Sequence, residues 1–226
     1  MGAKKKVLLG MSGGVDSAVS AVKLQQEGYE VLALFLRLHP DCGREEAGAR
    51  RVCRQLGAAF HPVNACAVFQ SAVKDYFIDS YAAGNTPNPC IRCNRLVKFK
   101  QLFKYQKILG CDLVATGHYA RVKREGNKYK LLKGADQQKD QSYFLYRLTA
   151  GELPHIIFPI GELDKDEVKE IADRKGLIIE KKESQDICFL GQEGRSQDHN
   201  EFLRQHLNPS PGQKKKKKGN QVGQHQ

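Results

Sequence analysis

The segment Ser12–Ser17, with the sequence SGGVDS, combines two glycines, two hydroxyls and a carboxylate between a short apolar run and a helical pattern. Glycines let the backbone approach a ligand closely, and the start of the following helix presents N–H groups to an anion. The segment does not end in the Gly-Lys-Ser/Thr of a Walker loop, so simple γ-phosphate transfer is not expected. We therefore predict a phosphate site here, with a purely structural turn as the alternative.

Three of the seven cysteines have neighbours that suggest chemistry. Cys93 follows the proline-rich loop 86–89, and we expect it to begin a helix, whose positive end favours a thiolate. Cys90 forms a Cys-x-x-Cys pair with Cys93. Cys188 lies in Ile-Cys-Phe-Leu, a composition typical of a buried core cysteine. The other four match no chemical motif and are expected to be small apolar residues or free thiols, namely Cys42, Cys53, Cys66 and Cys111.

Apolar runs alternate with helical patterns along most of the chain. This alternation predicts an α/β doubly wound parallel sheet with right-handed crossovers, whose ligands bind at the carboxyl ends of the strands. Expected strands are 7–10, 31–36, 59–63, 112–116 and 128–132. One helix is expected to start at Val15, and further helices are expected at 45–56, 68–81, 95–109, 165–175 and 201–206. Asp164 is the expected N-cap of the helix at 165–175.

Five motifs, SGGVDS, TPNPCIRCN, ATGHYARV, KDQSYFLY and ESQDICFLG, resemble the bacterial tRNA-specific 2-thiouridylase family, and the resemblance runs from Lys6 to Gln226. The first motif is the PP-loop of the ATP pyrophosphatases. The resemblance implies the PP-loop (adenine nucleotide alpha hydrolase-like) fold with a small helical extension. It further implies an ATP-binding catalytic domain at 1–150, an extension at 151–207 carrying the second catalytic cysteine, and a basic tail at 208–226 that is flexible or begins a further domain.

The activity implied by the resemblance is adenylation of a wobble uridine on O2, release of pyrophosphate and displacement of AMP by sulfur. ATP and Mg²⁺ would be required, with Asp16 helping to hold the metal ion. The implied ATP-binding residues are Gly10, Met11, Ser12, Gly13, Gly14, Val15, Asp16, Ser17, Leu36 and Gly117. The implied tRNA contacts are Asn88, Pro89 and Cys90 at the target base, and Lys139, Asp140 and Gln141. We expect His118 to be structural.

The resemblance also implies how sulfur moves. Cys188 would carry a persulfide from a donor, and Cys93 would release the sulfur by forming a disulfide with Cys188, by ordinary thiol exchange. Cys90 departs from the pattern, because the best-known members have Asp there. The three thiolates of Cys90, Cys93 and Cys188 would suit a [4Fe-4S] cluster with one open iron, whereas zinc would need a fourth ligand. Persulfide relay, an iron–sulfur cluster and a structural or redox Cys-x-x-Cys stay open as hypotheses.

The formal charge of +12, five units of which come from Lys214–Lys218, indicates a polyanionic partner such as tRNA. The other expected partner is a sulfur donor protein or sulfide. The chain shows neither an apolar run of membrane-spanning length nor a signal peptide, so we expect a cytoplasmic protein.

Members of the family continue beyond the equivalents of Gly223 and His225, so we expect a fragment or a short form. Two other functions stay open. One is a PP-loop sulfurtransferase acting on another nucleoside or a small molecule, and the other is a non-catalytic ATP-binding or iron–sulfur-binding module.

Overall fold

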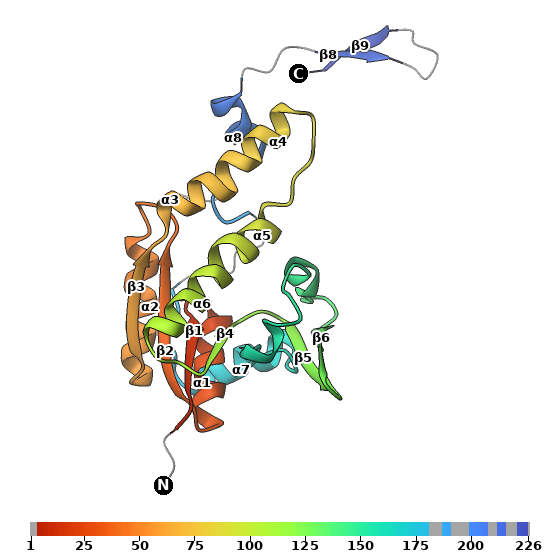
Figure 1. Cartoon of the computed structure of the whole chain (residues 1–226). Helices are drawn as coiled ribbons and strands as arrows, with labels where there is room; N and C mark the ends of the chain where they lie inside the picture. The colour runs from red at the N-terminus through yellow and green to blue at the C-terminus, as the bar shows by residue number, and fades with distance from the viewer. Residues whose placement is uncertain (1–3, 181–186, 191–198, 208–211, 216–220, 226) are drawn as a thin grey trace. The chain divides into compact units, whose positions relative to one another are not determined.

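The computed structural model of this 226-residue chain describes residues 4–180, 187–190, 199–207, 212–215 and 221–225 (Figure 1). These residues form two compact units. The first contains residues 4–75 and 88–180, and the second contains residues 76–87 together with the described residues from 187 onward. Residues 151–180, which we expected in an extension, are therefore grouped with the first unit. Each unit is described by itself below.

The first unit is built on a five-stranded sheet with the order β3-β2-β1-β4-β7, in which every neighbouring pair is parallel. The strands are β1 (Lys6–Gly10), β2 (Glu30–Arg37), β3 (Ala59–Asn64), β4 (Leu113–Thr116) and β7 (Ile156–Ile157). The predicted parallel α/β sheet is confirmed. The two-residue β7 gives no periodic pattern in the sequence and was not predicted.

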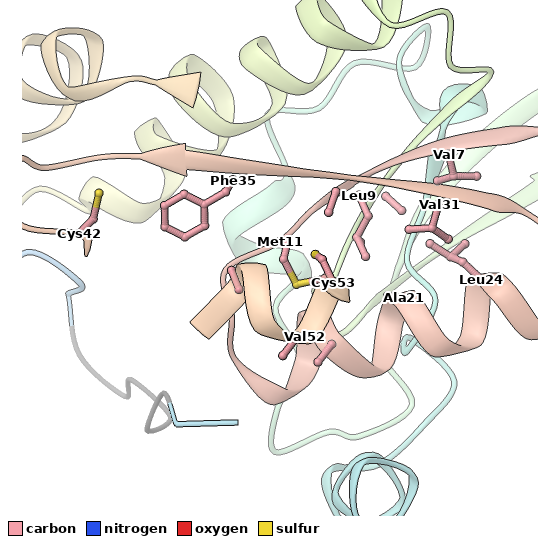
Figure 2. Close-up of a cluster of buried hydrophobic side chains, with 14 residues drawn as sticks. Val7, Leu9, Met11, Ala21, Leu24, Val31, Phe35, Cys42, Val52 and Cys53 are labelled. Carbon is pink, nitrogen blue, oxygen red and sulfur yellow. The ribbon is translucent and has the colours of Figure 1, made fainter. Parts of the chain in front are cut away.

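Alternate residues of the strands enter two separate cores, which is why the strands are apolar on both faces. Val7 and Leu9 pack with α1 (Val15–Gln26) and α2 (Gly43–Leu56), as Figure 2 shows. Leu8 faces the other way and packs with α6 (Phe99–Ile108). Each fully buried side chain of this size stabilises the fold by about 1.5–3 kcal/mol.

The helix that carries Cys93 begins earlier than we predicted. Asn88 caps it, because Asn88 Oδ1 accepts hydrogen bonds from the backbone N–H of Cys90 at 3.1 Å and of Ile91 at 3.4 Å. Pro89 takes the first helical position, where a missing N–H has no helical partner to lose. The run continues through α5 (Pro89–Arg92), the π-helical η2 (Cys93–Lys98) and α6. Cys93 thus lies inside the helical run, and the prediction that it begins the helix was wrong.

The predicted helix at 68–81 is confirmed, although its middle is π-helical. It consists of α3 (Cys66–Phe69), η1 (Gln70–Asp75) and α4 (Tyr76–Ala82). Arg92 Nε donates a hydrogen bond of 2.9 Å to the Ala72 carbonyl of η1, which ties this run to α5. π-Helical turns are uncommon and frequently accompany functional sites.

After β4 the chain forms an antiparallel hairpin of β5 (Ala120–Glu125) and β6 (Lys128–Lys133), of which only β6 was predicted. Two short 3-10 helices follow, η3 (Ser142–Leu145) and η4 (Leu153–His155). The predicted helix at 165–175 is α7 (Lys165–Arg174). Asp164 caps it, as predicted, and forms a capping box with Glu167.

The second unit contains α4, a turn at 187–190, α8 (His199–His206) and the paired strands β8 (Gly212–Lys215) and β9 (Gln221–His225). Phe77 is fully buried and packs against the rings of Phe189 and Phe202. Of the tail expected at 208–226, residues 208–211, 216–220 and 226 lie outside the described residues, as does most of the ESQDICFLG motif.

Candidate functional site

The PP-loop runs from the end of β1 into α1, and its hydroxyls hold its shape. Ser17 Oγ donates to the Gly14 carbonyl at 2.9 Å and accepts from the Ser12 N–H at 3.2 Å. Gly13 has φ +80°, and an added Cβ would come within 3.1 Å of the Ala49 backbone nitrogen in α2. The loop thus needs glycine at position 13 and ends at the start of a twelve-residue helix, where N–H groups can meet an anion.

The predicted nucleotide residues from different strands converge on one edge of the sheet. Gly10 is paired in register with Leu34 and Thr116, so Leu36, near the end of β2, and Gly117, directly after β4, lie at the same carboxyl edge. Leu36 is partly buried against the second core. The strand order therefore places the PP-loop, Leu36 and Gly117 at the same edge of the sheet.

Gly117 lies so close to the first turn of α1 that a side chain does not fit. An added Cβ would come within 2.8 Å of the Asp16 carbonyl carbon and 2.9 Å of the Ser17 nitrogen, both rigid backbone atoms. We expect Gly117→Ala to lower the free energy of unfolding by about 1–3 kcal/mol. Gly48→Ala, in the interior of α2 with nothing within 4 Å of the new Cβ, should raise it by roughly 0.5–1 kcal/mol. Urea unfolding of both variants measures these free energies. Similar changes in the free energy of unfolding in the two variants would contradict the close approach of Gly117 to α1.

Asp16 is held by two side chains that the sequence analysis did not single out. Its Oδ1 accepts a hydrogen bond from Tyr119 Oη at 2.9 Å and forms an ion pair with Lys165 Nζ at 2.8 Å. Lys165 is only 7% exposed, at the first position of α7, and α7 packs on α1 in a core that includes Tyr119. A lysine this buried is normally retained for a charged partner or ligand. The sequence did not indicate that Lys165 is buried, because the lysine lies in the charged segment LDKDE, which is typical of an exposed helix start.

The segment Lys139–Gln141, predicted to contact tRNA, connects the PP-loop region to η3. Gln141 exchanges two hydrogen bonds with the backbone of Tyr119, at 3.1 and 2.8 Å. Asp140 accepts from the backbone N–H groups of Gly134 and Ser142 and from the Ser142 hydroxyl, and these donors keep the pKa of its carboxyl low despite its partial burial. Both side chains thus fix the backbone locally, and a tRNA contact by this segment stays a prediction.

His118 follows β4 and hydrogen-bonds through Nδ1 to Thr116 Oγ1 at 2.8 Å. The residue as a whole is only partly buried, but its ring lies beside those of Phe99 and Phe158. Burial, with a smaller contribution from the Lys98 charge, lowers the pKa of His118 from 6.5 to about 3. The imidazole is therefore neutral in the folded protein at neutral pH.

This neutral histidine should make the fold sensitive to acid. Because the folded pKa lies below the unfolded value, the unfolded state binds the extra proton first, and stability falls as pH drops from about 6.5 towards 3. Between pH 7 and pH 5 the loss from this group should be about 2 kcal/mol. Urea unfolding at both pH values should show a smaller difference in His118→Gln than in the unaltered protein. Equal differences would contradict this account.

The described cysteines differ in their burial. Cys42 and Cys53 lie in the first core, as expected of small apolar residues, and burial raises the pKa of Cys53 to about 11. Cys90 is partly buried and Cys93 is 5% exposed, both in the first unit. Cys188 belongs to the second unit and is exposed, although its composition predicted a buried residue. Phe189 and Leu190 are buried instead and anchor the turn.

A metal cluster on Cys90, Cys93 and Cys188 stays a prediction. Within the ranges that the structure describes, no three His, Cys, Asp or Glu side chains are grouped as a metal site. The first unit supplies two of the three thiols and the second unit supplies the other. We therefore derive no step that requires an iron–sulfur cluster.

The parallel α/β sheet with a glycine-rich phosphate loop at its carboxyl edge defines a nucleotide-binding domain of the PP-loop class. Residues 5–192 match the model of the family described as "tRNA methyl transferase HUP domain". The chain belongs to this family.

Curated relatives include proteins named tRNA-specific 2-thiouridylase MnmA. The one from Pseudomonas fluorescens (strain SBW25) is 44% identical over 98% of this chain and 61% of the relative, and the one from Idiomarina loihiensis is 42% identical over 99% and 62%. The chain thus spans about three-fifths of their length. A solved structure, NMN synthetase from Francisella tularensis, shares the fold at a TM-score of 0.50 and 16% identity, covering 92% of this chain and 79% of that one. Among the described residues, no helix is long and apolar enough to span a membrane.

Proposed function

We propose that the chain catalyses ATP-dependent 2-thiolation of uridine in tRNA. The observation that carries the proposal is that one unit contains both the glycine-rich loop with the Asp16 carboxylate and the helical run that carries Cys90 and Cys93. The names of the relatives, with about 44% identity over nearly the whole chain, support the substrate and the product. Sulfurtransferases of this kind need both an activating nucleotide site and a thiol.

ATP would bind at the carboxyl edge of the sheet, with its phosphates at the loop Ser12–Ser17 and the start of α1. Mg²⁺ fits this site, because Asp16 provides a carboxylate in the first turn of α1, and carboxylate oxygens are ligands that Mg²⁺ prefers. The ion would neutralise charge that develops on the leaving pyrophosphate. Lys165, held beside Asp16, would add a second positive charge at the same place.

The activation step moves the uridine oxygen to phosphorus. Uridine O2 attacks the α-phosphorus of ATP, the bond from that phosphorus to the bridging oxygen breaks, and pyrophosphate leaves. A sulfur nucleophile then attacks C2 and AMP departs with the former O2. Tyr119 and Lys165 act as positioning residues, because they fix the orientation of the Asp16 carboxylate.

The sulfur is delivered by thiol chemistry in this proposal. The terminal sulfur of a persulfide on Cys188 attacks C2, and the Cys93 thiolate then attacks Cys188 Sγ, breaking the S–S bond and forming a Cys93–Cys188 disulfide. A dithiol reductant restores both thiols. The exposure of Cys188 suits loading by a donor protein, while the burial of Cys93 protects its thiol from unrelated oxidants.

The proposal is tested by incubating the purified chain with unmodified tRNA, Mg·ATP, a donor that transfers persulfide sulfur to thiols and a dithiol reductant, and analysing digested nucleosides by mass spectrometry. We expect 2-thiouridine in the presence of ATP and none without it. Pyrophosphate release with another nucleoside and not with tRNA would favour a different sulfurtransferase. ATP binding without turnover on any acceptor would favour the non-catalytic module.

A further inference from the structure

Two tyrosines at η3 are exposed in a way that their neighbours do not explain. Tyr143 and Tyr146 are each 62% exposed, and among the described residues Ile108 and Ile178 are the other large apolar residues that are exposed. Their ring centroids lie 6.2 Å apart at an interplanar angle of 36°. A tyrosine ring left in water forgoes the burial that would otherwise stabilise the fold, so a paired exposure indicates a surface for a partner.

This aromatic pair stands on a rigid support. Leu145, between the two tyrosines in sequence, is 1% exposed and packs in the core that also contains Phe99 and Leu102. Asp140 fixes the start of η3 through its hydrogen bonds to Ser142. The rings are therefore presented by a fixed backbone, which lowers the conformational entropy lost on binding.

The pair also lies beside the thiols of the first unit. η3 packs against α5, which carries Cys90, and against η2, which begins at Cys93. Asn94 Nδ2, next to Cys93, donates a hydrogen bond of 3.2 Å to the Phe144 carbonyl between the two tyrosines. A ligand on the tyrosines would be adjacent to the helical run that presents Cys90 and Cys93.

We propose that Tyr143 and Tyr146 form a stacking platform for unpaired bases of an RNA strand next to the target uridine. The inference rests on the proposed function and specifies how its RNA is held. Sequence-tolerant recognition of single strands combines aromatic stacking with positive charge, and the exposed Arg147 follows directly after Tyr146 in a chain of net charge +12. A second copy of the chain or a protein partner would not require this charge.

The absence of tryptophan from the sequence provides a direct reporter. Tyr143→Trp introduces a single tryptophan at the platform, and Ile108→Trp places it at an equally exposed position, 62%, at the end of α6. We expect a single-stranded oligoribonucleotide of anticodon-loop length to quench the tryptophan fluorescence of the Tyr143→Trp protein and leave that of the Ile108→Trp protein unchanged. A duplex of the same sequence should quench the platform tryptophan only weakly.

The affinity of the same oligoribonucleotide separates stacking from folding. Tyr143→Ala and Tyr146→Ala should each weaken binding by about tenfold, whereas Tyr143→Phe and Tyr146→Phe should stay within about twofold of the unaltered protein. The inference would be overturned if the alanine variants bound with unaltered affinity, or if duplex and single strand quenched equally. Quenching that follows protein concentration without RNA would also overturn it. The assay contains neither ATP nor a sulfur source. Quenching without thiolation would thus count against the proposed function alone, and thiolation without quenching against the platform alone.

Discussion

Asp16→Asn is expected to reduce RNA-dependent pyrophosphate release by on the order of 10²- to 10³-fold. The amide keeps an oxygen that can accept from Tyr119, but it removes the negative charge that faces Lys165 and that would hold a divalent cation. Pyrophosphate release is measured with saturating Mg·ATP and tRNA. Asp166→Asn, an exposed carboxylate one residue after Lys165, should leave the rate unchanged.

A loss of folding must be separated from a loss of chemistry in this experiment. Asp16→Asn leaves the Lys165 ammonium buried without its counter-charge, which is destabilising. The double variant Asp16→Asn, Lys165→Met removes that charge as well, so its urea midpoint should recover while its activity stays low. Recovery of activity together with stability would show that Asp16 supports the fold and does not act on the nucleotide.

Cys93→Ala is expected to lower 2-thiouridine formation by about 10³-fold or more, because the only group proposed to release the sulfur is lost. Uridine activation does not use this thiol, so initial pyrophosphate release with tRNA should persist. Product is measured by nucleoside mass spectrometry, and pyrophosphate in the same reactions. In Cys93→Ala the formation of 2-thiouridine should therefore fall while pyrophosphate release persists, whereas in Asp16→Asn both should fall.

Cys53→Ala is the matched control for the loss of a buried thiol. Cys53 is 1% exposed, lies in the first core and makes the same volume change on substitution. We expect a modest decrease in stability, about 1 kcal/mol, and unchanged product formation. Thiolation by Cys93→Ala at the rate of the Cys53→Ala protein would remove Cys93 from the reaction.

The sheet and its phosphate loop could be predicted because local patterns encode them. Apolar runs such as Val31–Leu36 can satisfy both faces of a parallel strand, and the position of SGGVDS after the first run places the loop at the carboxyl edge. The two-residue β7 could not be predicted, since its pairing with β4 depends on tertiary packing. The start of the Cys93 helix was missed because the sequence analysis assigned Pro89 to the proline-rich loop 86–89, whereas Asn88 caps the helix and Pro89 is its first residue.

The candidate site was predicted where one segment carries it and missed where distant segments meet. Ser12–Ser17 is a continuous signal in one segment, and its hydrogen bonds and close glycine packing hold the loop at the sheet edge, while phosphate binding there stays a prediction. Lys165 is 149 residues from Asp16, and an isolated lysine in a charged helix start gives no sign of burial. The exposure of Tyr143 was equally hidden, because aromatic residues in a mixed segment more often indicate core.

The origin of the oxygen in AMP tests the central claim most directly. A tRNA whose target uridine carries a heavy-oxygen label at O2 is incubated with the chain, Mg·ATP and a sulfur source, and the AMP is analysed by mass spectrometry. If uridine O2 attacks the α-phosphorus and sulfur then displaces AMP, the label must appear in AMP in step with 2-thiouridine. Thiolated RNA accompanied by unlabelled AMP would contradict the account.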